Sequence, residues 1–257
     1  GTAVSVVDIL HSTLFEWIKT NKAQDWEMRD WIKDISEDPG TQDWGVDAHR
    51  DIILKFGVAI ELAATNRLPG RTSEKPKGIT IKDILNLNEL HWFNLQQNTP
   101  LLKECIKEFQ LCVLGKQFPY KACPYPISAS IYIALYWKLK IEKPTWTKKR
   151  LDQIFKAFFW HNALSLGYET DSHRVPDDIK AIESKLIELE SATDATWAKE
   201  VNQWLDKHME PIKKPAEIKI KLMEKAHGAM KNALELPIRY LPDDDLCKPS
   251  QSVISVS

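Results

Sequence analysis

Apolar side chains recur every three to four residues along most of the chain, and the segments between these stretches are polar or contain proline and glycine. This spacing places the apolar side chains on one face of a helix. Ser5 and Asp8 precede the first such stretch, and Thr80 and Asp83 precede a later one. Each pair matches a capping box, in which a hydroxyl and a carboxylate satisfy free amide groups at a helix start. The pattern therefore predicts amphipathic helices with defined beginnings.

Glycine, proline and capping residues divide the periodic pattern into separate helices. Besides the helices that begin after Ser5 and after Thr80, we expect helices over residues 23–35, 47–66, 99–115, 127–141, 147–166, 176–189, 195–207 and 216–236. Thr99 is expected to cap the helix that Pro100 opens, and Gly115 to end it. No two segments show the alternation that is typical of paired strands. The expected fold is all-α, an irregular multi-helix bundle of about nine to ten helices with no significant sheet.

The length of 257 residues exceeds that of a usual single domain, so one large helical domain and two smaller lobes both remain open. We expect a helical region over residues 1–190. Residues 191–242 should form C-terminal helices that pack on this region or lead to a further domain. The polar residues 243–257 lack periodicity and are expected to form a loose tail.

The formal net charge of −1 excludes a global positive field of the kind that steers proteins onto nucleic acid. A contact with DNA would therefore need a local patch. The longest apolar run, from Ile127 to Trp137, is too short to cross a membrane. The four cysteines have no paired spacing, and the first residues lack a secretory signal pattern, so we expect a cytoplasmic protein without a membrane partner.

Three basic residues in succession, Lys148, Lys149 and Arg150, form one local patch that could contact DNA or a neighbouring domain. A solvated helix end is the alternative interpretation, because acidic residues alternate with such clusters. His161 lies within an aromatic helix and could line a functional groove. Tyr168 and Arg174 complete the set of candidate DNA or interdomain contacts.

The stretch PDDIKAIESK resembles parts of a metal-dependent nuclease, with Asp177, Asp178 and Lys185 as the candidate residues. That chemistry needs an acid and a lysine held on adjacent strands around a divalent cation. Here the spacing places all three on one helix, so an acidic helix start that complements the helix dipole is the favoured interpretation. We expect no catalytic residues, no metal site and no cofactor in this chain.

Three segments, taken in order, resemble the helical region of the GmrSD-like family of restriction and phage-defence proteins. The first is GTAVSVVDILHSTLF. The second comprises ILNLNELHWFN, a helix that ends near Gly115, and FPYKACPYPISASIYIAL. The third is LDQIFKAFFWHNALSLGYETDSHRVPDDIKAI. The three prolines of the middle segment exclude a continuous helix there and form an elbow before an apolar helix. The residues that match the family's motifs are Gly1, Thr2, Ser5, Asp8, Pro119, Tyr120, Trp160, Ser165, Tyr168 and Asp178. Gly167 departs from the pattern, since the family usually has arginine there.

The resemblance implies a role for this chain within a larger protein. Family members typically join an N-terminal ParB/sulfiredoxin-like NTPase domain, a helical middle region and an HNH-type nuclease domain. The catalytic motifs of the NTPase and nuclease domains do not occur in this sequence. The expectation is therefore a non-catalytic helical portion, excised from an NTP-dependent DNA endonuclease, that couples the two missing domains and could contact DNA. The alternative is an unrelated helical scaffold that binds another protein through the apolar faces of its first and last helices.

Overall fold

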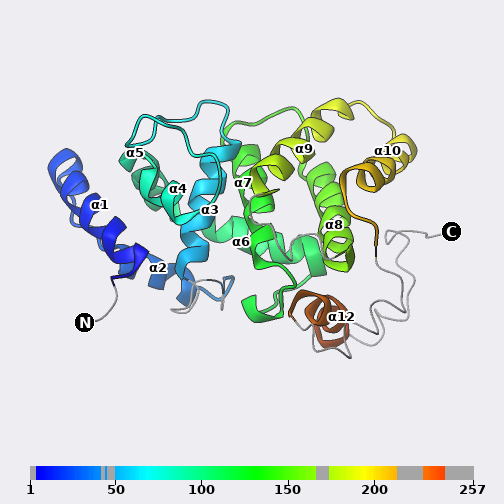
Figure 1. Cartoon of the computed structure of the whole chain (residues 1–257), viewed down its shortest axis with the longest axis horizontal. Coiled ribbons are helices and arrows are strands. Elements are labelled where there is room, and N and C mark those ends of the chain that lie inside the picture. The colour runs from blue at the N-terminus through cyan, green and yellow to red at the C-terminus, as the bar shows by residue number, and fades with distance from the viewer. Residues whose placement is uncertain (1–3, 42–43, 45–49, 166–173, 213–227, 241–257) are drawn as a thin grey trace.

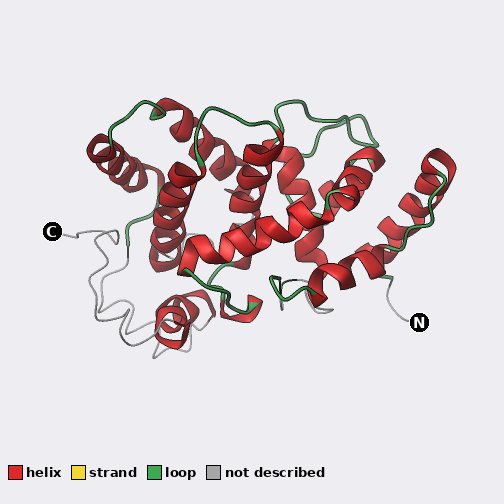
Figure 2. Ribbon diagram, turned by 180° about the vertical axis from the view of Figure 1, so that it is seen from behind, coloured by secondary structure: helices red, strands yellow, loops and turns green. Residues whose placement is uncertain are grey.

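The computed structural model describes residues 4–41, 44, 50–165, 174–212 and 228–240, and within these ranges its only regular secondary structure is helical (Figures 1 and 2). The α-helices are α1 (Val6–Lys22), α2 (Met28–Glu37), α3 (Arg50–Ala63), α4 (Ile81–Asn86), α5 (Glu89–Gln97), α6 (Thr99–Leu114), α7 (Ala129–Ile141), α8 (Lys148–Ser165), α9 (Val175–Glu188), α10 (Asp194–His208) and α12 (Gly228–Tyr240). Two short 3-10 helices, η2 (Tyr120–Ala122) and η3 (Pro126–Ser128), lie between α6 and α7. The expected all-α class is confirmed.

Both predicted capping boxes form. The Ser5 hydroxyl accepts a hydrogen bond from the Asp8 amide at 3.3 Å, and the Asp8 carboxylate accepts one from the Ser5 amide at 3.2 Å. Thr80 and Asp83 repeat this arrangement with distances of 3.3 Å and 3.1 Å at the start of α4. At the end of α6, Gly115 has a φ of 77°, the left-handed conformation in which glycine is favoured.

Helix α7 lies at the centre of the fold. It contacts α3, α6, α8 and α9, and α3 runs alongside it as its main neighbour (Figure 1). Because helices pack around α7 on several sides, all residues from Ala129 to Tyr136 are buried, and all of them except Ser130 have apolar or aromatic side chains. A helix that is apolar around its whole circumference is typical of a core element.

An aromatic cluster holds the elbow that precedes α7. The buried ring of Trp44 lies 5.3 Å from that of Phe109 and 5.3 Å from that of Tyr120, measured between ring centroids. The Trp44 indole donates a hydrogen bond to the Phe118 carbonyl oxygen at 3.1 Å, and the Gln110 side chain accepts one from the Phe118 amide at 3.0 Å. These bonds fix the irregular backbone of the elbow against α6.

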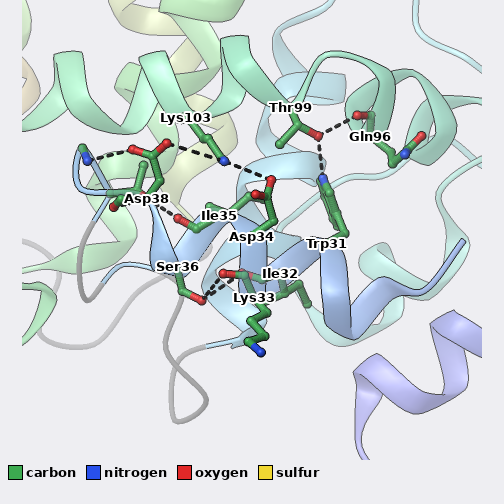
Figure 3. A network of polar contacts seen from close by, with 12 residues as sticks. Trp31, Ile32, Lys33, Asp34, Ile35, Ser36, Asp38, Gln96, Thr99 and Lys103 are labelled. Carbon is green, nitrogen blue, oxygen red and sulfur yellow. Dashed lines mark hydrogen bonds and ion pairs between the residues drawn. The ribbon is translucent and has the colours of Figure 1, made fainter.

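Polar contacts tie α2 to the first half of α6, as Figure 3 shows. The Trp31 indole donates to the Thr99 hydroxyl at 2.8 Å. Lys103 lies 2.9 Å from a carboxylate oxygen of Asp34 and 3.5 Å from one of Asp38. Because these residues come from segments more than 60 positions apart, the contacts fix the N-terminal helices onto the core.

The observed helices differ from the prediction at several points. Helix α2 begins at Met28 rather than at residue 23, because Ala23 adopts a left-handed conformation with a φ of 50° that ends α1. Asn98, not Thr99, is the N-cap of α6, and the Thr99 hydroxyl instead donates to the Gln96 carbonyl oxygen at 2.6 Å. Helix α5 (Glu89–Gln97) was not predicted as a separate element between the helix that follows Thr80 and the helix over residues 99–115.

The C-terminal helices α10 and α12 both contact α8, and α12 also contacts η2. The expected loose tail at 243–257 lies outside the described residues. Of the last predicted helix, only the part from Gly228 onward can be compared with the structure.

Candidate functional site

The basic patch at the start of α8 is neutralised by carboxylates. The Lys148 ammonium lies 2.6 Å from an Asp152 oxygen and 3.1 Å from a Glu108 oxygen. Although partial burial acts to lower the pKa of Lys148, hydrogen bonds to these two carboxylates raise it above its ordinary value. The two nearby carboxylates offset the positive charge of Lys148, which weakens its attraction for a phosphate.

Lys149 and Arg150 both contact Asp194 at the start of α10, at 3.3 Å and 3.0 Å. The Arg150 guanidinium also donates to the Ala192 carbonyl oxygen at 2.9 Å and lies 4.5 Å from the centroid of the Trp197 ring. Hydrogen bonds from Lys149 and its charge lower the pKa of Asp194. The basic patch therefore connects α8 to α10.

A second cluster lies where α8, α9 and α10 meet. Asp178, only 1% exposed, is 2.9 Å from Nε2 of His208 and 3.7 Å from the Arg174 guanidinium. His161 is buried, and its Nε2 lies 2.9 Å from the Glu210 carbonyl oxygen. His208, the last residue of α10, therefore contacts α9, and Glu210, two residues further on, contacts α8. The buried carboxylate therefore has the His208 ring within hydrogen-bond distance and the Arg174 guanidinium nearby, as burial of a charge requires.

The remaining parts of the nuclease interpretation do not come together. Asp177 is exposed, and Lys185 pairs with Glu188 at 2.6 Å on the same helix. Within the part of the chain that the structure describes, no group of three or more metal-ligating side chains converges. Asp178 thus serves as a packing and charge-pairing residue among the described helices.

The residues that carry the family resemblance take structural roles where they are described. Ser5 and Asp8 cap α1, and hydrogen bonds from Ser5 and Arg29 lower the pKa of Asp8 from 3.8 to about 2. Trp160 donates to the Val113 carbonyl oxygen at 3.3 Å, and Ser165 donates to that of Asn162 at 3.3 Å. Pro119 and Tyr120 form the start of η2. Gly1, Thr2 and Tyr168 lie outside the described residues.

A cavity of about 330 Å³, not predicted from the sequence, lies between the end of α3, helix α5 and the end of α7. At its inner side Glu61, 3% exposed, is 3.1 Å from Nδ1 of His91. Nε2 of His91 lies 2.8 Å from the Gly57 carbonyl oxygen, and Glu61 also accepts a hydrogen bond from the Leu68 amide. The pair therefore holds α3, α5 and the loop after α3 together.

Lys138 lines the same cavity from α7. Its ammonium is 2.8 Å from the Ala63 carbonyl oxygen and 2.6 Å from a Glu183 oxygen, and Glu142 lies 3.7 Å away. The sequence offers one sign of this cavity, which is a charged residue within or beside an apolar stretch. Glu61 lies in the apolar part of α3, and Lys138 directly follows the apolar run of α7. Their convergence depends on helix packing, which the sequence pattern does not specify.

No protein-family model, curated protein or solved structure matches this chain. Among the described helices, none combines the length and the apolar character that crossing a membrane would require.

Proposed function

We propose that this chain is the non-catalytic helical portion of a GmrSD-like DNA restriction and phage-defence protein. In this role it couples a ParB-like NTPase domain to an HNH-type nuclease domain, and it does so through contacts with protein rather than by holding DNA itself. The resemblance of three ordered segments supplies the family. The ion pairs between the basic patch and nearby carboxylates are the reason that we propose contacts with protein rather than with DNA.

The observation that carries this proposal is the pairing of the candidate DNA contacts. Lys148, Lys149, Arg150 and Arg174 each have a carboxylate within 4 Å, and His161 contacts a backbone carbonyl. DNA bound at these side chains would lie beside the carboxylates that pair with them, and those carboxylates would repel its phosphates. The same contacts connect α8 to α6 and to α10, which favours a rigid connecting body.

The segments that resemble the family also support the proposal by the shapes they adopt. The first begins a capped helix, the middle one forms an elbow of two 3-10 turns before the apolar α7, and the third contains the aromatic α8. The elbow before an apolar helix and the aromatic helix are the features for which the second and third segments resemble the family, which supports the proposal.

Titration of a fluorescent DNA duplex with the purified chain, from about 50 to 200 mM salt, tests the mode of action. We expect no binding that weakens steeply with salt. The same preparation should hydrolyse neither ATP nor GTP and should not cut DNA in the presence of magnesium. A binding constant whose logarithm falls linearly with the logarithm of salt concentration, with a slope of several units, would contradict the protein-contact role. Turnover of either substrate would contradict the non-catalytic role.

A second candidate function is that of a helical scaffold unrelated to phage defence. It is favoured by exposed apolar side chains near the N-terminus, since Val4 is 71%, Ile9 45% and Ile81 59% exposed, and α1 contacts α4. The reading frame upstream of Gly1 separates the two candidates. A ParB-like domain with its Gln-Gln-Arg string supports the first function, and a frame without one supports the scaffold.

A further inference from the structure

The cavity between α3, α5 and α7 combines an apolar wall with a charged inner side. Its volume of about 330 Å³ lies within the range of small-molecule sites. Ile60, Leu95, Ile141 and the half-buried ring of Trp137 provide apolar surface, and Glu61, His91, Lys138 and Glu142 provide polar groups. A ligand that fits this lining needs an apolar body and at least one polar or charged group.

The charges around the cavity favour a cation. Lys138 lies 2.6 Å from Glu183, so the charge of its ammonium is already balanced by a carboxylate that does not line the cavity. Glu61 and Glu142 then remain: Glu61 is 3.1 Å from His91, and Glu142 lies 3.7 Å from the Lys138 ammonium, farther than Glu183 does. The summed charge of these five residues is negative whether His91 is neutral or protonated. Arg67 follows the lining residue Asn66 but donates to the Leu62 carbonyl oxygen and does not line the cavity.

Glu142 is the carboxylate best placed to receive such a ligand. Glu61 is almost completely buried by its contacts with His91 and Leu68, whereas the Glu142 side chain is 29% exposed at the outer part of the cavity. Its two oxygens accept hydrogen bonds from the amide and the hydroxyl of Thr65, at 3.0 Å and 2.6 Å. Because a carboxylate offers about four lone-pair directions, both oxygens can accept a further donor.

We propose that this cavity binds a small organic amine, a monocation with an apolar body, and that Glu142 pairs with its ammonium group. The indole of Trp137 then provides the aromatic surface against the apolar body and the cation. Nucleotides and other phosphates are disfavoured, because Glu61 and Glu142 would repel them. This inference does not depend on the proposed role in phage defence.

Calorimetric titration with a matched pair of probes tests the inference on the intact chain. Phenethylamine carries the expected charge and apolar ring, and 2-phenylethanol replaces the ammonium by a neutral hydroxyl on the same body. We expect the amine to bind about tenfold more tightly than the alcohol. Inorganic phosphate should not bind at this cavity.

Three variants separate ligand pairing from a structural effect. Glu142→Gln should bring the affinity of the amine close to that of the alcohol, since it removes the charge and keeps an acceptor for Thr65. Trp137→Leu should weaken both probes. Glu16→Gln, at an exposed position on α1 outside the cavity, removes the same charge and should change neither affinity.

Each other result overturns the inference. Equal affinity for the amine and the alcohol would show that charge does not select the ligand. Absence of binding of both probes at millimolar concentration would exclude this ligand class. If Glu142→Gln weakened both probes by the same factor while the protein remained folded by circular dichroism, Glu142 would be a structural residue and the proposed pairing would be wrong.

Discussion

Gly57 on α3 packs directly against Trp92 and Leu95 of α5, so Gly57→Ala should destabilise the protein. A Cβ atom at this position would lie 2.7 Å and 2.9 Å from two carbons of the Trp92 ring and 3.0 Å from a Leu95 methyl carbon. Ordinary contacts begin near 3.4 Å, so the indole must move by about 0.7 Å within a buried environment. Overpacking of this kind costs about 1–3 kcal/mol.

The helix propensity of alanine acts in the opposite direction. Replacement of a mid-helix glycine by alanine stabilises a helix by about 1 kcal/mol. The net result expected for Gly57→Ala is a loss of up to about 2 kcal/mol in the free energy of unfolding. Urea unfolding followed by circular dichroism measures this loss if the transition remains two-state.

A double-mutant cycle isolates the contact between Gly57 and Trp92. In a Trp92→Phe background the two clashing ring carbons are removed, so Gly57→Ala should become neutral or stabilising by up to about 1 kcal/mol. The change of sign is the diagnostic result. If Gly57→Ala stabilises the wild-type protein by about 1 kcal/mol, the full gain in helix propensity, then α3 and α5 are not as close as described and the cavity between them has a different shape.

Three further predictions concern other parts of the fold. Arg150→Ala should lower the free energy of unfolding, measured in urea, by about 1–2 kcal/mol, because it removes the hydrogen bond to Ala192 and the contact with the Trp197 ring. Lys149→Ala removes only an exposed ion pair and should change the free energy of unfolding by less than about 0.5 kcal/mol. Similar losses for both variants would contradict the assignment of Arg150 as the tether to α10. The pKa of Asp8 is lowered from 3.8 to about 2 in the folded protein, so its stabilisation is present above pH 3.8 and is lost as the pH falls towards 2. The difference in urea stability between wild type and Asp8→Asn should therefore shrink over that interval, and a constant difference would refute the charge-dependent cap. Burial raises the pKa of the thiols of Cys105, Cys112 and Cys123, so these three should resist an aromatic disulfide reagent at pH 8 until urea unfolds the chain, and rapid reaction of any of them in the native protein would contradict their burial.

Local chemistry made much of the helix pattern predictable. The two capping boxes, the glycine that ends α6 and the start of α8 after Thr147 depend on residues within one helical turn, and all are found. The late start of α2 was not predictable in this way, because Ala23 adopts a left-handed conformation that alanine rarely takes. Such a conformation is imposed by the surrounding fold.

The site features were less predictable because they depend on tertiary contacts. Asp194 neutralises Lys149 and Arg150 from more than 40 positions away, so the local sequence around the basic patch gave no sign of it. The cavity likewise depends on the packing of α3, α5 and α7, which brings Glu61, His91 and Lys138 together. Periodicity indicates which face of a helix is buried, but it does not indicate which charged residues meet there.

Membership of a larger defence protein is the central claim, and the reading frame that encodes the chain in its native genome tests it most directly. Sequencing upstream of the codon for Gly1 should reveal a ParB-like domain that contains a Gln-Gln-Arg string, continuous with the helix that Ser5 and Asp8 cap. An initiation site directly at Gly1, with no such domain encoded in the same frame, would contradict the account.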